Sequence, residues 1–181
     1  MYAVRIEALG AGADPGLAAT ARDLLREYGD FVLSATGPER FAAARLTSEI
    51  AEPAARYAAP GSELLLAFVG ERAAGCAAFR PLEGSVPELA CELKRLWVRP
   101  AFRRGAIGEG LAHAVFERAA AAGYRAIYLD TEPESMPAAV RLYRRLGFEQ
   151  CPAYNDQVVE GLSFFRRTLP GLPDQPAPST G

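Results

Sequence analysis

The hydrophobic pattern of this chain changes its period at Pro100, and that change limits the folds open to it. Apolar runs of strand length come before it, at 63–69, 73–80 and 89–98. After it, residues 108–122 carry an apolar stripe with helical spacing that ends at Gly123. Strands in direct succession followed by a helix predict a mixed sheet covered by helices, because each element must bury its apolar face against another.

The remaining segments complete the expected order of elements. Residues 2–9 alternate like a strand, and a helical pattern opens at Pro15 and is expected to stop near Gly29. The other predicted helices are 38–58, broken at Pro53, and 137–146. The other predicted strands are 126–129, a segment from Phe148 onward, and 161–169. The expected fold class is α/β (α+β), with a mixed, mostly antiparallel central sheet and helices on both faces.

Length and composition fit one domain, which we place at residues 1–169. Residues 170–181 hold four prolines and no apolar periodicity, so they are predicted to form a disordered tail. A net charge of −2 lacks the basic excess of a nucleic-acid-binding domain. The apolar runs are too short to span a membrane, and the amino terminus has no secretory layout.

The cysteines indicate a reducing compartment. Cys76, Cys91 and Cys151 are odd in number and lack the close spacing of a metal site. We therefore expect neither a disulfide framework nor a bound metal. Together with the missing secretory pattern, this predicts a cytoplasmic protein.

The loop after Pro100 carries most of the chemistry in the sequence. It is rich in Arg and Gly, it contains Arg103 and Arg104, and it leads into the helix that begins at Gly108. Small residues let successive amides point at one anion, and the N–H groups at a helix N-terminus add a positive partial charge. Such a loop suits a pyrophosphate, although a tight strand-to-helix connection uses the same residues.

Two motifs resemble those of the GCN5-related N-acetyltransferases. The run 98–111 is similar to the family's acetyl-CoA signature R/Q-x-x-G-x-G/A, with Arg103 in the leading position and Ala106 where the first Gly is usual. Residues 139–148, AVRLYRRLGF, are similar to the family's A-x-x-L-Y-x-x-x-G-F, and Met136 stands where many members have Asn. A looser resemblance extends over well more than half of the chain.

This resemblance implies a GNAT-like fold and the direct transfer of an acetyl group from acetyl-CoA to an amine, without a covalent enzyme intermediate or a metal. The residues implied to contact the cofactor are Trp97, Val98, Arg103, Arg104, Gly105, Ala106, Ile107 and Gly108. The strand that ends at Val98 is implied to splay from its neighbour. Tyr143 takes the family's position of the general acid that protonates the leaving thiolate. Glu92, from its place just before the active strand, is the candidate base, acting directly or through water.

Each catalytic assignment has a structural alternative. Tyr143 lies on an apolar helical stripe and can be a core tyrosine. Glu92 can pair with a neighbouring Arg on a solvated face. His113 is the only histidine, and glutamates four residues away on either side place it on the polar face of its helix. We expect it to face solvent. Tyr154, Asn155 and Asp156 fall in a loop expected to line the acceptor pocket.

The sequence leaves three functional hypotheses. The first is an N-acetyltransferase acting on a small-molecule amine. The second is a non-catalytic module that binds acyl-CoA, and the third is a transferase for a longer acyl group. No nucleic-acid or membrane partner is expected. The resemblance allows a homodimer, because family members often pair at the sheet edge.

Overall fold

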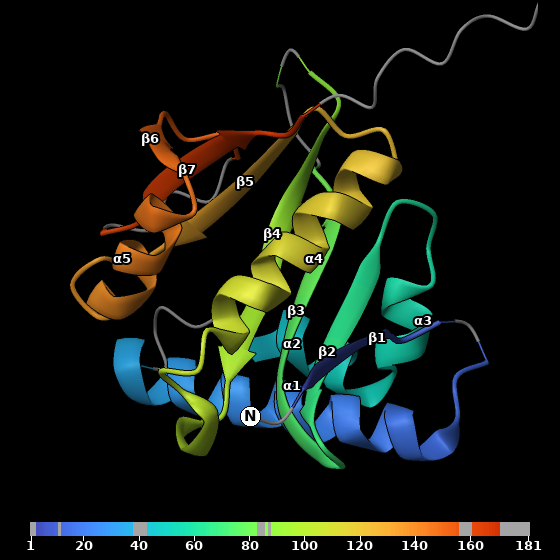
Figure 1. Cartoon of the computed structure of the whole chain (residues 1–181). Coiled ribbons are helices and arrows are strands. Elements are labelled where there is room, and N and C mark those ends of the chain that lie inside the picture. Colours follow the sequence, from blue (N-terminus) through green and yellow to red (C-terminus); the bar gives the residue numbers. More distant parts are fainter. Residues whose placement is uncertain are drawn as a thin grey trace, which may run out of the picture.

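The computed structural model describes residues 3–10, 12–37, 43–82, 86, 88–155 and 161–170. It contains one seven-stranded sheet in the order β1-β2-β3-β4-β5-β7-β6 (Figure 1). The strands are β1 (Val4–Ala8), β2 (Glu63–Val69), β3 (Arg72–Pro81), β4 (Ala90–Val98), β5 (Ala126–Thr131), β6 (Glu149–Cys151) and β7 (Ser163–Thr168). All neighbours run antiparallel except β4 and β5, which are parallel.

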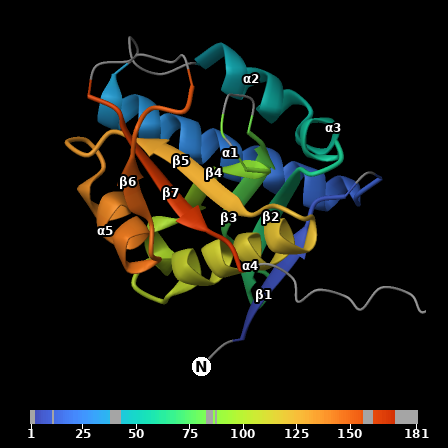
Figure 2. The ribbon, with the colours of Figure 1, turned by 90° about the horizontal axis from the view of Figure 1, so that it is seen from above.

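Helices cover both faces of this sheet (Figure 2). On one face lie α1 (Pro15–Thr36), α2 (Ala43–Ala51) and α3 (Pro53–Tyr57). On the other lie α4 (Ile107–Ala121) and α5 (Pro137–Arg145), and a short 3-10 turn, η1 (Pro100–Phe102), precedes α4. The predicted fold class is therefore confirmed. The tail predicted to be disordered lies, from residue 171, outside the described residues.

Alternation along β2 divides the core into two layers. Leu65 and Ala67 face α4 and join the larger cluster, which also contains Val115. Leu64 and Leu66 face α1 and join the second cluster. All of these side chains are fully buried, so β2 is covered on both faces, as expected when helices pack above and below a sheet.

Helix α1 is longer than the sequence predicts. Its start is as expected, because the Asp14 carboxylate accepts hydrogen bonds from the N–H groups of Gly16 and Leu17 at 2.8 and 3.2 Å. The stop predicted near Gly29 is wrong: Gly29 is buried within the helix, which continues to Thr36. A glycine inside a helix costs only about 1 kcal/mol, which packing against the sheet outweighs. The extra turns reach the candidate active site.

The sheet opens between β4 and β5. These strands pair only from Ala90 opposite Ala126 to Glu92 opposite Tyr128, although both continue beyond that point. On its other edge, β4 has an irregular register with β3 near Arg95, whose φ is 58°. Such a bulge bends a strand and increases its twist. The splay expected for this strand is therefore present.

Candidate active site

The turn between η1 and α4 presents a run of backbone N–H groups. Arg104 and Ala106 have φ values of 68° and 58°, in the left-handed region. Within the described part of the chain, no N–H from Arg104 to Glu109 donates a hydrogen bond; the first to do so is that of Gly110, to the Ala106 carbonyl at 2.9 Å. Alternating backbone conformations before a helix start form an anion-binding concavity. This turn is a candidate phosphate site.

Among the residues implied to contact the cofactor, Arg103 is occupied elsewhere. Its Nε donates to the Val98 carbonyl at 3.0 Å, and its guanidinium lies 4.8 Å from the ring centroid of Trp97 and 5.5 Å from that of Phe31. These contacts hold the turn against β4 and α1. Arg104 is exposed at the turn. The cofactor contacts themselves remain predictions.

Trp97 is buried and faces α1. Its indole Nε1 donates to Glu27 at 3.3 Å, and Glu27 also forms an ion pair with Arg99 at 2.8 Å. The hydrogen bonds from Arg99 hold the pKa of Glu27 below its usual range despite partial burial, which acts in the opposite direction. This contact between α1 and β4 fixes the end of the strand from which the turn departs.

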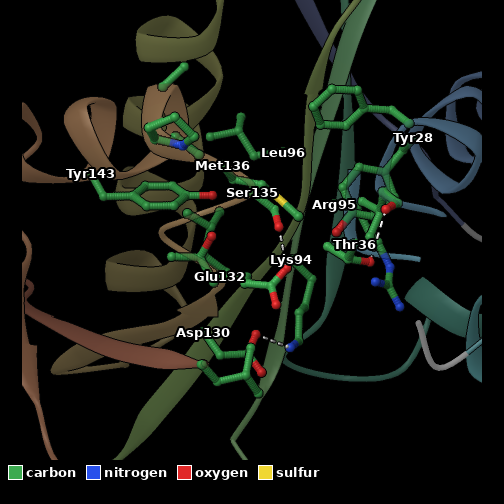
Figure 3. Close-up of a pocket in the computed structure, with 18 of the residues that line it drawn as sticks. Tyr28, Thr36, Lys94, Arg95, Leu96, Asp130, Glu132, Ser135, Met136 and Tyr143 are labelled. Carbon is green, nitrogen blue, oxygen red and sulfur yellow. Dashed lines mark hydrogen bonds and ion pairs between the residues drawn. The ribbon is translucent and has the colours of Figure 1, made fainter. Parts of the chain in front are cut away.

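A cavity of about 330 Å³ lies where β4 and β5 part (Figure 3). Its walls come from the last turns of α1, from β4, from the segment that follows β5, and from α5. Polar side chains on its walls are Tyr28, Thr36, Arg80, Lys94, Arg95, Asp130, Thr131, Glu132, Ser135 and Tyr143. Apolar side chains on its walls include Phe31, Val32, Leu96 and Met136.

The side chain of Tyr143 points from α5 into this cavity (Figure 3). Its ring packs edge-on against Phe148, with the centroids 5.8 Å apart, and no described residue forms a hydrogen bond with its hydroxyl. Burial raises the pKa of Tyr143 above its ordinary value of 10.0, so the hydroxyl is protonated at neutral pH. Tyr143 is thus partly packed, as the structural alternative expects, and also able to donate a proton into the cavity.

Glu92 is buried behind the cavity and surrounded by donors. Arg80 Nη2 lies 3.1 Å from one carboxylate oxygen, and the other accepts from Lys94 at 2.7 Å and from the Tyr154 hydroxyl at 2.9 Å. Burial alone would raise the pKa of Glu92, but the positive charges of Lys94 and Arg80 hold it below its usual range. The arrangement orients Lys94 and Arg80 at the cavity wall; a base role for Glu92 remains a prediction.

Two further sequence predictions are settled by the geometry. His113 is exposed, as predicted. Tyr154 does not line the cavity, contrary to expectation; it is buried between Tyr128 and Phe164, and its hydroxyl serves Glu92. Asp156, predicted from the same loop, lies outside the described residues.

Sequence reasoning missed the acidic groups at the end of β5. Asp130 pairs with Lys94 at 3.1 Å, and Glu132, only 5% exposed, accepts a hydrogen bond from the Ser135 hydroxyl at 2.5 Å. Both line the cavity. Their position directly after a short apolar strand was the available signal, because polar residues at the end of a parallel strand commonly line a site.

A buried ion pair connects α2 to the bulge of β4. Arg95 Nε and Nη2 donate to the two carboxylate oxygens of Glu49 at 2.7 and 3.0 Å, and the Tyr57 hydroxyl donates to the same carboxylate at 2.9 Å. Burial alone would raise the pKa of Glu49, but the hydrogen bonds and charge of Arg95 lower it. Helices α2 and α3 are thereby fixed to the strand that opens the sheet.

The fold and this site define an α/β protein with a cavity where two strands of its sheet part, and with a helix start whose first N–H groups donate no hydrogen bond to the described residues. Residues 22–148 match the model of the acetyltransferase (GNAT) family, and the chain belongs to that family. The resemblance seen in the sequence is confirmed. No helix in the described residues is both long and apolar enough to cross a membrane, and no group of three potential metal ligands occurs among them.

Comparisons with individual proteins agree with this family. An uncharacterized N-acetyltransferase of Schizosaccharomyces pombe is 33% identical over 119 residues, which are 65% of this chain and 71% of that protein. An acetyltransferase structure from Streptococcus agalactiae has a TM-score of 0.69 at 18% identity and covers 92% of this chain and 98% of its own. Salmonella typhimurium yncA, solved with its cofactor acetyl-CoA, has a TM-score of 0.63 at 20% identity and covers 99% of both chains. The two structures share the fold.

Proposed function

We propose that this protein is an N-acetyltransferase that transfers an acetyl group from acetyl-CoA directly to the amine of a small molecule. The observations that carry the proposal are the run of N–H groups from Arg104 to Glu109 that donate no hydrogen bond to the described residues, and the cavity into which Tyr143 points. The yncA structure adds support, because a protein of the same fold binds acetyl-CoA. A cytoplasmic location is part of the proposal, since the three cysteines form no disulfide.

The amides of the turn fit the diphosphate of acetyl-CoA. Their N–H groups carry partial positive charge, and the left-handed residues Arg104 and Ala106 allow neighbouring N–H groups to converge. Acetyl-CoA would supply the acetyl group as a thioester. The edge of β4 beyond Glu92, which β5 leaves unpaired, offers backbone groups to an extended ligand arm.

Tyr143 is proposed as the proton donor to the leaving sulfur. When the amine nitrogen bonds to the acetyl carbon and the carbon–sulfur bond breaks, the thiolate needs a proton, because a thiol has a pKa of about 8.5. The raised pKa of Tyr143 keeps its hydroxyl protonated until that step. Loss of such a general acid reduces turnover by about 10²-fold or more.

Calorimetry with CoA and a thiol-release assay on a panel of amines test the proposal together. We expect CoA to bind and release to depend on acceptor. Tyr143→Phe should lower kcat by about 10²-fold with unchanged CoA affinity, whereas Tyr128→Phe, outside the cavity, should keep wild-type kcat. Binding without turnover on any amine would favour the non-catalytic module, and faster release from long-chain acyl-CoA would favour the third hypothesis. Absence of CoA binding would overturn the proposal.

A further inference from the structure

The proposed reaction needs a group that takes a proton from the acceptor nitrogen, and Glu92 is poorly placed to do so. Glu92 is 4% exposed and does not line the cavity. Its Oε2 accepts from Arg80 Nε and Nη2 at 3.2 and 3.1 Å, and its Oε1 contacts Lys94 at 2.7 Å and the Tyr154 hydroxyl at 2.9 Å. A carboxylate has about four acceptor sites. These donors therefore leave Glu92 little capacity for a proton from a ligand.

Asp130 has the features that Glu92 lacks. It extends from β5, beyond the last residue that pairs with β4, and it lines the cavity (Figure 3). Its side chain is 18% exposed, and its Oδ1 accepts a hydrogen bond from Lys94 at 3.1 Å. Among the described residues, no group donates a hydrogen bond to its other oxygen, Oδ2. Asp130 thus reaches the cavity with an oxygen that can accept a proton.

The other carboxylate on the cavity wall is less accessible. It belongs to Glu132, which is 5% exposed and accepts a hydrogen bond from the Ser135 hydroxyl at 2.5 Å. Asp130 is therefore the better candidate for contact with a ligand in the cavity.

Asp130 and the proposed acid, Tyr143, face the same cavity from different elements, β5 and α5 (Figure 3). Burial is the main cause of the raised pKa of Tyr143, and the negative charge of Asp130 adds to it. A protonated hydroxyl and a carboxylate in one cavity are the two kinds of group that acyl transfer to nitrogen uses, one to give a proton and one to take it.

We propose that Asp130 is the catalytic base that takes the proton from the acceptor nitrogen, directly or through one water. This inference rests on the proposed function, and it replaces Glu92 as the base. Lys94, whose ammonium contacts both carboxylates, links Asp130 to the buried Glu92. Glu92 then has a structural role in this part of the wall.

Each proton in this step has a donor and an acceptor. The lone pair of the neutral amine forms the bond to the acetyl carbon, which makes the proton on nitrogen acidic, and Asp130 accepts that proton. The carbon–sulfur bond breaks with its electron pair on sulfur, and sulfur receives the proton of Tyr143. Asp130 then passes its proton to the Tyr143 phenolate, directly or through water. The products are the amide and the free thiol of CoA.

Asp130→Asn tests the residue, with Asp23→Asn as the matched control. Asp23 also pairs with a basic side chain, Arg26 at 2.9 Å, but it lies on the exposed side of α1 and does not line the cavity. The wild type is first assayed with acetyl-CoA and phenethylamine, putrescine and glycinamide, and the best of these amines is used for the variants. We expect Asp130→Asn to lower kcat by about 10²-fold or more with unchanged CoA affinity. Asp23→Asn should keep wild-type kcat.

Rescue by small molecules separates a base from a partner that only balances the charge of Lys94. Imidazole at about pH 8 is mostly neutral, so it can accept a proton but cannot replace a carboxylate beside an ammonium. We expect imidazole to raise the kcat of Asp130→Ala by at least about tenfold, with the amide product measured by mass spectrometry. Rescue by formate but not by imidazole would show that Asp130 serves only as an ion-pair partner, and would overturn the inference.

Glu92→Gln provides a test that does not depend on the folding of the Asp130 variants. If Glu92 were the base, imidazole would restore turnover to Glu92→Gln; we expect it to have no effect there. Restoration of Glu92→Gln by imidazole, or wild-type kcat in Asp130→Asn, would overturn the inference and leave the proposed function intact. CoA binding by the wild type without turnover of any amine would count against the proposed function, and the inference would fall with it.

Discussion

Ala106 adopts a left-handed backbone conformation at the N-cap of α4, with φ 58° and ψ 8°. A side chain in this region costs about 1–2 kcal/mol, so the glycine usual in the related motif would be cheaper here. The methyl group does not prevent the turn from presenting its amides; its effect is a local cost in stability.

Ala106→Gly should therefore stabilise the protein. Relief of the left-handed conformation is offset in part by the greater freedom of glycine in the unfolded chain, which leaves a net gain of about 0.5–1 kcal/mol. Urea unfolding measures it. Ala101→Gly, at an exposed position of η1 without positive φ, serves as the control and should not stabilise. A loss of stability in Ala106→Gly would contradict this account of the turn.

At the scale of elements, the part of β4 that diverges from β5 is held by carboxylates from two helices on one face of the sheet. Glu27 anchors Trp97 and Arg99 to α1, and Glu49 anchors Arg95 to α2. These carboxylates come from segments far from β4 in sequence. A bulged strand without them would lose the contacts that fix its conformation.

Removing the charge of Glu49 should be strongly destabilising. Glu49→Gln leaves the buried guanidinium of Arg95 without its counter-charge, and breaking such a pair costs about 3 kcal/mol or more. Glu52→Gln, an exposed position just beyond α2, should change the free energy of unfolding by less than about 0.5 kcal/mol. Chemical denaturation of both variants measures these changes. Similar free energies of unfolding for Glu49→Gln and Glu52→Gln would contradict the prediction.

The same pair predicts how stability depends on pH. The pKa of Glu49 is lower in the folded state than its ordinary value of 4.5. The ionised carboxylate therefore makes its full contribution to the free energy of unfolding above about pH 4.5. It is lost as the pH falls further, through the folded-state pKa. We expect the free energy of unfolding of Glu49→Gln to fall less steeply than that of the wild type below about pH 4.5. Parallel curves would show that this carboxylate does not contribute.

The sequence predicted those elements whose signals are local. The helix after the Arg- and Gly-rich loop, the hairpin of β2 and β3, and the amide-bearing turn all follow from neighbouring residues. Helix α1 was predicted too short, because a propensity argument at Gly29 ignored the packing that covers it. Asp130 and Glu132 were missed. They line one cavity with Lys94 and Tyr143 only because β4 and β5 diverge, and no local sequence pattern predicts that divergence.

At the scale of the whole molecule, ligand binding should be visible as thermal stabilisation. A ligand at about 100 times its dissociation constant adds about 2.7 kcal/mol, which raises the Tm of a domain of this size by about 5–10 °C. We expect this shift with CoA. Pantetheine lacks the diphosphate that the turn is proposed to hold, so at the same concentration it should give a much smaller shift. Equal shifts would argue against the turn as the binding site.

Phe31 is part of the cavity wall and also of the packing around Trp97 and Arg103. It lines the cavity, and its ring lies 5.0 Å from that of Trp97 and 5.5 Å from the Arg103 guanidinium. A substitution that reshapes the proposed acceptor wall at this position also disturbs the packing of Trp97 and Arg103 next to the turn. If the proposed function holds, selection for a new amine at Phe31 is therefore coupled to the affinity for acetyl-CoA, whereas Thr36, one and a half turns further along α1, can vary with less effect on that affinity.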